Sequence, residues 1–165
     1  MKKTLLILLF ALSALSVSAQ DWDFGSRSSI ARGHRFGFEA GITSFESEIA
    51  LDLGFRWQYD FHEYISWDVV TLKALAQFNN FDGSLTPEIL TGLRLFTPEL
   101  IGMRLYGNAG IGYDYNPDTG YGGLALQLGI GLRVTDTVSI GYAFDRMKLD
   151  DFKVTSHGLC VAFLF

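Results

Sequence analysis

Ser156 and His157, adjacent near the end of the chain, have the side chains of a nucleophile and a general base. In a hydrolase the imidazole takes the proton of the hydroxyl, so both groups must reach one site. Neighbouring residues of a strand point to opposite faces, and this pair falls in a strand-like segment. The other histidines are expected outside the strands, His34 before the first one and His62 in a turn, so they do not converge with His157. We therefore expect no catalytic, cofactor-binding or metal-binding site.

A second candidate is the glycine spacing of residues 107–112, which resembles a phosphate-binding loop. Such a loop must open a helix, and no helical pattern follows here. The glycines instead lie within an alternating segment, where small residues suit a crowded interior. We do not expect a nucleotide site.

Composition limits the class of protein. The chain has 165 residues, of which 48% are hydrophobic, 15% aromatic and 19% charged, with 18 glycines and 3 prolines. This favours one folded domain over a disordered or collagen-like chain. The single cysteine excludes an intramolecular disulfide, and the net charge of −5 has the wrong sign for nucleic-acid binding.

The first nineteen residues have the pattern of a cleaved signal peptide. Lys2 and Lys3 precede an apolar run, and small residues at Val17 and Ala19 predict cleavage before Gln20. The alternative, a retained membrane helix, is disfavoured because the run is shorter than the ~20 residues that a span needs. We expect an exported chain, with residues 20–34 as a lead-in to the first strand.

Alternation of apolar with small or polar residues dominates the rest of the chain. It is clearest over 48–59, 103–115 and 123–134, and weaker over 36–43, 138–145 and 158–165. Residues 64–78 change phase near Val69 and Val70, where we predict a bulge. One more strand, which brings the number to eight, is predicted over 88–96, between the segments 64–78 and 103–115, and begins after Pro87. Turn-forming residues separate these segments, so the sequence predicts an all-β, eight-stranded antiparallel up-and-down barrel with no crossover helices.

The bulky apolar face is expected to point outward. Exposed to water it would exceed the apolar patch of a soluble monomer, whereas the opposite face is a mixture of glycine, alanine and charge suited to a narrow bore. Aromatic residues such as Trp57, Tyr59 and Tyr113 gather towards strand ends, as in the two belts of a membrane barrel. A soluble ligand-binding barrel is the alternative.

The pattern and its last strand resemble the small eight-stranded outer-membrane barrels of Gram-negative bacteria, of the OmpA/OmpX type. Phe165 and Phe163 match the terminal aromatic signal by which the outer-membrane insertion machinery recognises such barrels, although Cys160 stands where the family pattern has glycine. The resemblance covers residues 35–165. It implies periplasmic termini and outer loops after the first, third, fifth and seventh strands.

Charged residues on the inward phase are expected to form a network that fills the bore, because unpaired buried charge is costly. The candidates are Glu39, Asp52, Arg56, Asp68, Arg94, Arg104, Arg133 and Asp145, with Glu48, Lys73, Glu88 and Asp114 on the same phase.

We expect a non-enzymatic, monomeric barrel with a structural or interaction role in outer-membrane lipid. The alternatives are a narrow ion or small-solute channel and, with less support, a lipid A-modifying enzyme. Arg146, Lys148 and Lys153 are candidate contacts for lipopolysaccharide phosphates, with interfacial snorkelling as the other explanation.

Overall fold

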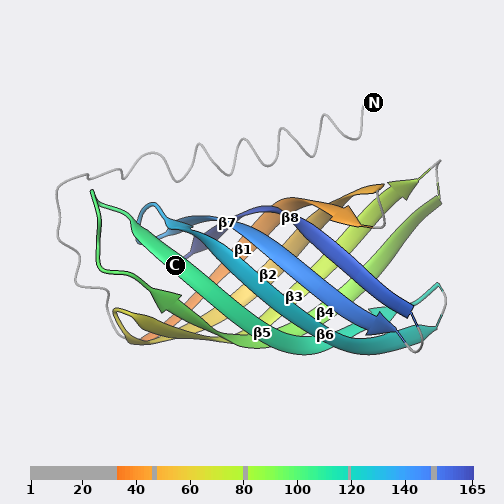
Figure 1. Ribbon diagram of the computed structural model, residues 1–165, viewed down its shortest axis with the longest axis horizontal. Helices are drawn as coiled ribbons and strands as arrows, with labels where there is room; N and C mark the ends of the chain where they lie inside the picture. The colour runs from red at the N-terminus through yellow and green to blue at the C-terminus, as the bar shows by residue number, and fades with distance from the viewer. Residues whose placement is uncertain (1–32, 46–47, 80–81, 119, 150–151) are drawn as a thin grey trace.

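The computed structural model describes residues 33–45, 48–79, 82–118, 120–149 and 152–165. The expected signal peptide and residues 20–32 of the lead-in lie outside these ranges. Eight strands fold the described chain (Figure 1): β1 (Gly33–Phe45), β2 (Glu48–His62), β3 (Ile65–Asn79), β4 (Asp82–Phe96), β5 (Arg104–Asn116), β6 (Tyr121–Arg133), β7 (Val138–Leu149) and β8 (Phe152–Leu164). None of the described segments is a helix long and apolar enough to cross a membrane.

The strands form one closed antiparallel barrel in sequence order. Closure comes from pairing of β1 with β8, in which Glu39 lies opposite Ala162. Beyond that ladder, Phe36 and Phe165 exchange both backbone hydrogen bonds, at 3.0 and 2.8 Å. Closure leaves no free edge where all eight strands pair, so the backbone donors and acceptors of that part of the wall are satisfied without water.

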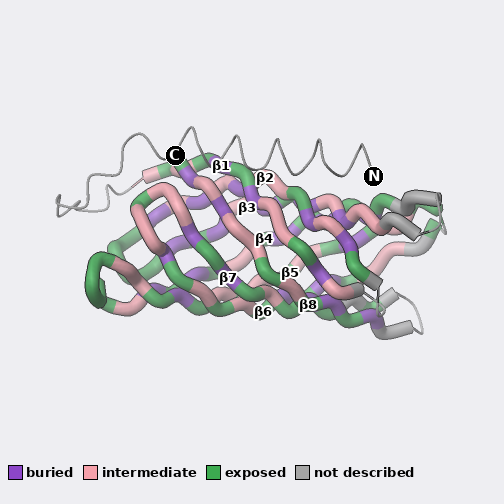
Figure 2. Tube along the Cα trace, turned by 90° about the horizontal axis from the view of Figure 1, so that it is seen from above, coloured by how far each residue is buried: buried purple, intermediate pink, exposed green. Residues whose placement is uncertain are grey.

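Each strand presents an apolar outer face and a small or polar inner face. Leu128 and Ile130 on the outer face of β6 are 61% and 62% exposed, whereas Gln127 between strand neighbours of this kind is 6% exposed. Figure 2 shows the same alternation of buried and exposed positions along the strands. The inward-polar, outward-apolar orientation predicted from the sequence is confirmed.

The predicted bulge in β3 is confirmed. Gln58 of β2 pairs with Asp68, and the residue before it, Trp57, pairs with Val70. Val69 therefore has no partner in that ladder. The pairing of β3 with β4 shifts at the same place, between Asp68 and Thr71. The extra residue restores the phase, so that both Asp68 and Thr71 are buried.

Several strand boundaries differ from the prediction: β2 continues to His62 rather than ending near residue 59, and β8 begins at Phe152 rather than at residue 158. β4 begins at Asp82 rather than after Pro87, and β1 begins at Gly33 rather than at residue 35. Pro87 pairs with Ala74 of β3 but lies beyond the last β4–β5 pair, Glu88 with Asp114. Proline is tolerated there because the ladder that would need its N–H has ended.

The barrel has two ends that differ in their connections. We call the end where β1 begins and β8 finishes the terminal end; it carries the β2–β3, β4–β5 and β6–β7 turns. The opposite end, with the other four connections, is the loop end. In the β4–β5 turn, Leu100 and Met103 exchange backbone hydrogen bonds of 2.7 and 3.1 Å around Ile101 and Gly102.

Candidate functional site

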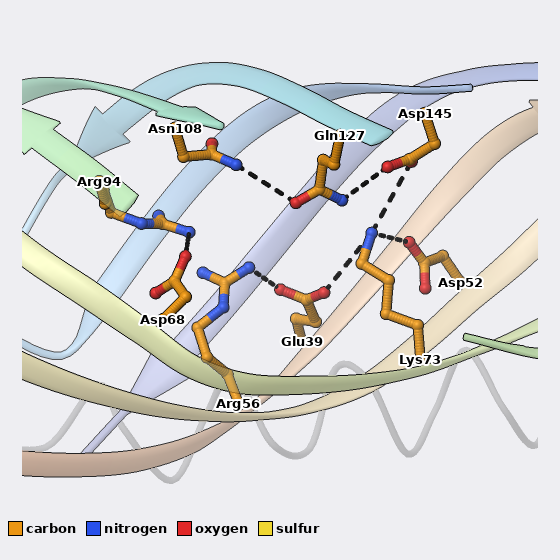
Figure 3. A network of polar contacts seen from close by, with 9 residues as sticks. All are labelled: Glu39, Asp52, Arg56, Asp68, Lys73, Arg94, Asn108, Gln127 and Asp145. Atoms are coloured by element: carbon orange, nitrogen blue, oxygen red, sulfur yellow. Dashed lines mark hydrogen bonds and ion pairs between the residues drawn. The ribbon is translucent and has the colours of Figure 1, made fainter. Parts of the chain in front are cut away.

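The centre of the bore is occupied by charged side chains (Figure 3). Nζ of Lys73 lies 3.2 Å from Asp52 and 3.8 Å from each of Glu39 and Asp145. Glu39 also forms an ion pair with Arg56. One ammonium group thus faces three carboxylates that come from β1, β2 and β7.

Amide side chains extend this cluster along the opposite wall. Nε2 of Gln127 donates to Asp145 at 2.7 Å, and Nδ2 of Asn108 donates to Gln127 at 3.2 Å. These contacts join β5, β6 and β7 to the charged residues of β1, β2 and β3. The polar network therefore crosses the interior from wall to wall.

Towards the terminal end the network becomes richer in arginine. Nη2 of Arg94 donates to Asp68 at 3.1 Å, and its guanidinium carbon lies 4.3 Å from the centre of the Tyr106 ring. Arg133 stacks in the same way on Phe96, at 4.0 Å. Aromatic faces attract a cation, so the Tyr106 ring stabilises Arg94 in addition to Asp68, and the Phe96 ring stabilises Arg133.

Seven of the eight residues predicted for the bore are buried on its inner face. They are Glu39, Asp52, Arg56, Asp68, Arg94, Arg133 and Asp145.

The eighth, Arg104, lies instead at the rim of the terminal end. Its Nη1 donates to the carbonyl oxygen of Glu63 at 2.9 Å, and its Nη2 lies 3.7 Å from the Glu63 carboxylate. As the first residue of β5 it is close enough to the β2–β3 turn to leave the interior. A hydrogen bond with the same carboxylate raises the pKa of Tyr64.

Several interior residues did not emerge from the charge pattern alone. Gln58 and Ser66 donate to Asp60, whose other oxygen lies 3.6 Å from Arg35. The alternation placed Tyr106 on the inner phase, but not its stacking with Arg94. The available signal was the glycines opposite: a Cβ built on Gly131 would lie 2.6 Å from the Tyr106 ring.

The histidines do not form a common site. His34 accepts a hydrogen bond from Trp57 at 3.0 Å, the His62 ring lies tilted against Tyr64, and Nδ1 of His157 lies 2.9 Å from the Tyr142 hydroxyl. Ser156 is buried in the bore whereas its neighbour His157 is exposed on the outer face. Within the described part of the chain, no cluster of three or more His, Cys, Asp or Glu side chains could hold a metal ion.

The outer face carries the remaining predicted residues. Arg146 and Lys148 are exposed on β7, in register with Leu126 and Leu124 of β6. Lys153 is in register with Lys148, and its side chain lies outside the described part. Phe165 is 69% exposed and Phe163 half-buried on the outer face, at the seam between β8 and β1.

Several solved structures resemble this barrel. Neisserial surface protein A is similar with a TM-score of 0.61 at 12% identity, over 79% of this chain and 94% of that chain. The N-terminal barrel domain of OprF from Pseudomonas aeruginosa gives 0.54 at 16%, over 82% and 100%. Ail from Yersinia pestis gives 0.53 at 15%, also over 82% and 100%.

No protein-family model and no curated protein sequence matches the chain. The structural likenesses nevertheless show that it has the fold of the eight-stranded outer-membrane barrels, as the resemblance of the sequence implied.

Proposed function

We propose that this chain, which has the outer-membrane barrel fold, is an integral outer-membrane protein whose bore is closed and whose role is structural or one of interaction. It is not proposed as an enzyme. Its outer face is apolar and its polar groups lie inside, which suits a bilayer and not water. The chain is expected to be a monomer inserted by the outer-membrane machinery.

The observation that carries this proposal is the polar network across the bore. Lys73 of β3 contacts Asp145 of β7, and Gln127 continues the chain of contacts to Asn108 of β5. The hollow beside this network, lined by Asp68, Gly92 and Gln127 among others, is too small for a water molecule. Eight strands enclose little lumen, and the side chains of this network extend into it, which supports a closed bore.

Planar-bilayer recording tests the closed bore. The purified barrel should add no reproducible unitary current to a bilayer. Defined current steps would favour the narrow channel instead. Two variants provide a comparison. If the wild type conducts through the bore, Lys73→Ala, which shortens the central side chain, should change the size of the current steps. Lys148→Ala, on the outer face, should not.

Membrane integration is tested by extraction and gel mobility. The folded protein should require detergent for extraction and should migrate differently before and after boiling. Purification as a stable monomer without detergent would favour a soluble ligand-binding barrel and would contradict the proposal.

We further propose that Arg146, Lys148 and Lys153 bind phosphate groups of lipopolysaccharide. Arg146 and Lys148 point outward next to leucines, so they are placed where a lipid headgroup can reach them. Replacing all three by glutamine should weaken binding of detergent-solubilised lipopolysaccharide. Arg104→Gln removes a charge at the opposite end and should have no effect. If the triple variant bound lipopolysaccharide as well as Arg104→Gln does, the three residues would only extend their charges to the membrane interface.

A further inference from the structure

Glu88 and Asp114 form a buried pair of carboxyl groups. They lie directly opposite each other on β4 and β5, both on the inner face, and are 3% and 0% exposed. Directly opposed strand residues have Cβ atoms only about 5 Å apart. No hydroxyl, amide, guanidinium or ammonium donor among the residues that the structure describes reaches any of their four carboxyl oxygens.

The nearest basic residue does not neutralise this pair. Lys73 is the cross-strand partner of Glu88 on the other side. Its ammonium group, however, is directed to Glu39, Asp52 and Asp145, each within 4 Å. Among the described side chains, Glu88 and Asp114 form no ion pair of comparable length.

The described interior contains more acidic than basic side chains. Seven buried carboxyl side chains face four buried basic side chains and the half-buried Arg35, which pairs with Asp60. The excess is therefore two negative charges. The two carboxyl groups that no described donor reaches lie opposite each other, so the formal excess of negative charge is concentrated at one place.

We propose that Glu88 and Asp114 bind one divalent cation of the Mg²⁺ or Ca²⁺ class near the loop end of the bore. Oxygen ligands suit these ions, and Mg²⁺ commonly uses one or two carboxylates while water supplies its other ligands. The inward neighbours of Asp114 are small: Gly112 lies two residues before it, and Gly123 is its partner on β6. Asp114 also lies two residues from the end of β5, which places the site close to the loop-end opening.

Thermal unfolding of the detergent-solubilised barrel tests the site. At constant ionic strength set with NaCl, millimolar Mg²⁺ or Ca²⁺ should raise the unfolding midpoint of the wild type by several degrees relative to EDTA, because the ion binds the folded state. The double variant Glu88→Gln, Asp114→Asn should show no such shift. Asp118→Asn, in an exposed turn, is the matched control and should keep the full response.

A second measurement does not depend on the variant folding. Mn²⁺ added to the labelled wild-type barrel should broaden the amide resonances of Gly112 and Gly123 before those of the outer-face glycine Gly107. A midpoint without cation dependence, a cation shift that survives in the double variant, or Mn²⁺ broadening that begins elsewhere would each overturn the proposal. A midpoint that depends on pH alone would indicate a protonated carboxyl pair and would also overturn it.

Discussion

Lys73 on β3 and Asp145 on β7 meet at 3.8 Å, although the two strands are four positions apart around an eight-stranded barrel. They therefore start from opposite walls of the bore. A contact of this kind braces the barrel across its width, which backbone pairing between neighbouring strands cannot do. It also places charge where a continuous water path would have to run.

Lys73→Met should destabilise the barrel strongly. The substitution keeps a long, unbranched side chain but leaves Glu39, Asp52 and Asp145 without their shared cation. Breaking a buried ion pair by removing one partner costs about 3–5 kcal/mol. Urea unfolding in detergent, followed by gel mobility, measures the loss. Lys148→Met on the outer face is the control, and equal effects of the two variants would contradict a bracing role for Lys73.

Gly131→Ala should destabilise the barrel, whereas Gly107→Ala should not. A Cβ at Gly131 would lie 2.6 Å from Cζ of Tyr106 and closer still to the carbonyl oxygen of Ile140, so the ring that stacks on Arg94 must move. Overpacking of this kind costs about 1–3 kcal/mol. At Gly107 the nearest atom would be 3.8 Å away. Chemical unfolding of both variants against wild type gives the comparison, and equal stabilities would show that Tyr106 is not held by this glycine.

Much of the fold could be predicted because a barrel wall repeats one simple rule. Residues 123–134 alternate strictly, and every leucine among them faces out. Even the bulge at Val69 was visible as a change of phase. The sequence predicts a strand start after Pro87 because proline commonly marks a boundary. In the structure β4 starts earlier, because only the β4–β5 ladder ends at Glu88 while the β3–β4 ladder continues past Pro87.

The interior could be predicted only in part, because alternation fixes the face of a residue and not its partner. It placed Arg104 inside, but a residue at the end of a strand can turn to the rim, where Glu63 binds it. It could not show that Lys73 prefers three carboxylates over its own cross-strand neighbour Glu88. Such pairings depend on how far a side chain extends across the bore towards strands that are distant in the sequence. The local alternation pattern contains no information on those distances.

Ile101→Asn should stabilise the β4–β5 turn. Ile101 has a φ of 54° and is 97% exposed, and Gly102 follows with a φ of 75°. A two-residue turn with positive φ at both positions favours Asn-Gly, and the left-handed conformation costs other residues about 1–2 kcal/mol. The gain should appear as a higher unfolding midpoint. Ile101→Val, equally branched, should give none; a gain in both variants would point to removal of apolar surface instead.

Leu128→Arg should impair folding into lipid bilayers. Leu128 lies on the outer face near the middle of β6 and is 61% exposed. Arginine facing lipid at the bilayer midplane costs about 2–4 kcal/mol. Folding into liposomes, titrated with urea, should show this loss, and Asp118→Arg in the exposed β5–β6 turn should not. If Leu128→Arg folded as well as wild type, the outer face would not be in contact with acyl chains.

Phe165→Ala should reduce assembly in cells more than it reduces the stability of the refolded barrel. The backbone of Phe165 exchanges both hydrogen bonds with Phe36, and an alanine can keep them, whereas its exposed ring is free for recognition by the insertion machinery. Outer-membrane yield and the unfolding midpoint in detergent should be measured on the same variant. Phe38→Ala, which removes another exposed ring at the same seam, should retain the yield. Parallel losses of yield in both variants would show that the ring serves the lipid contact and not assembly.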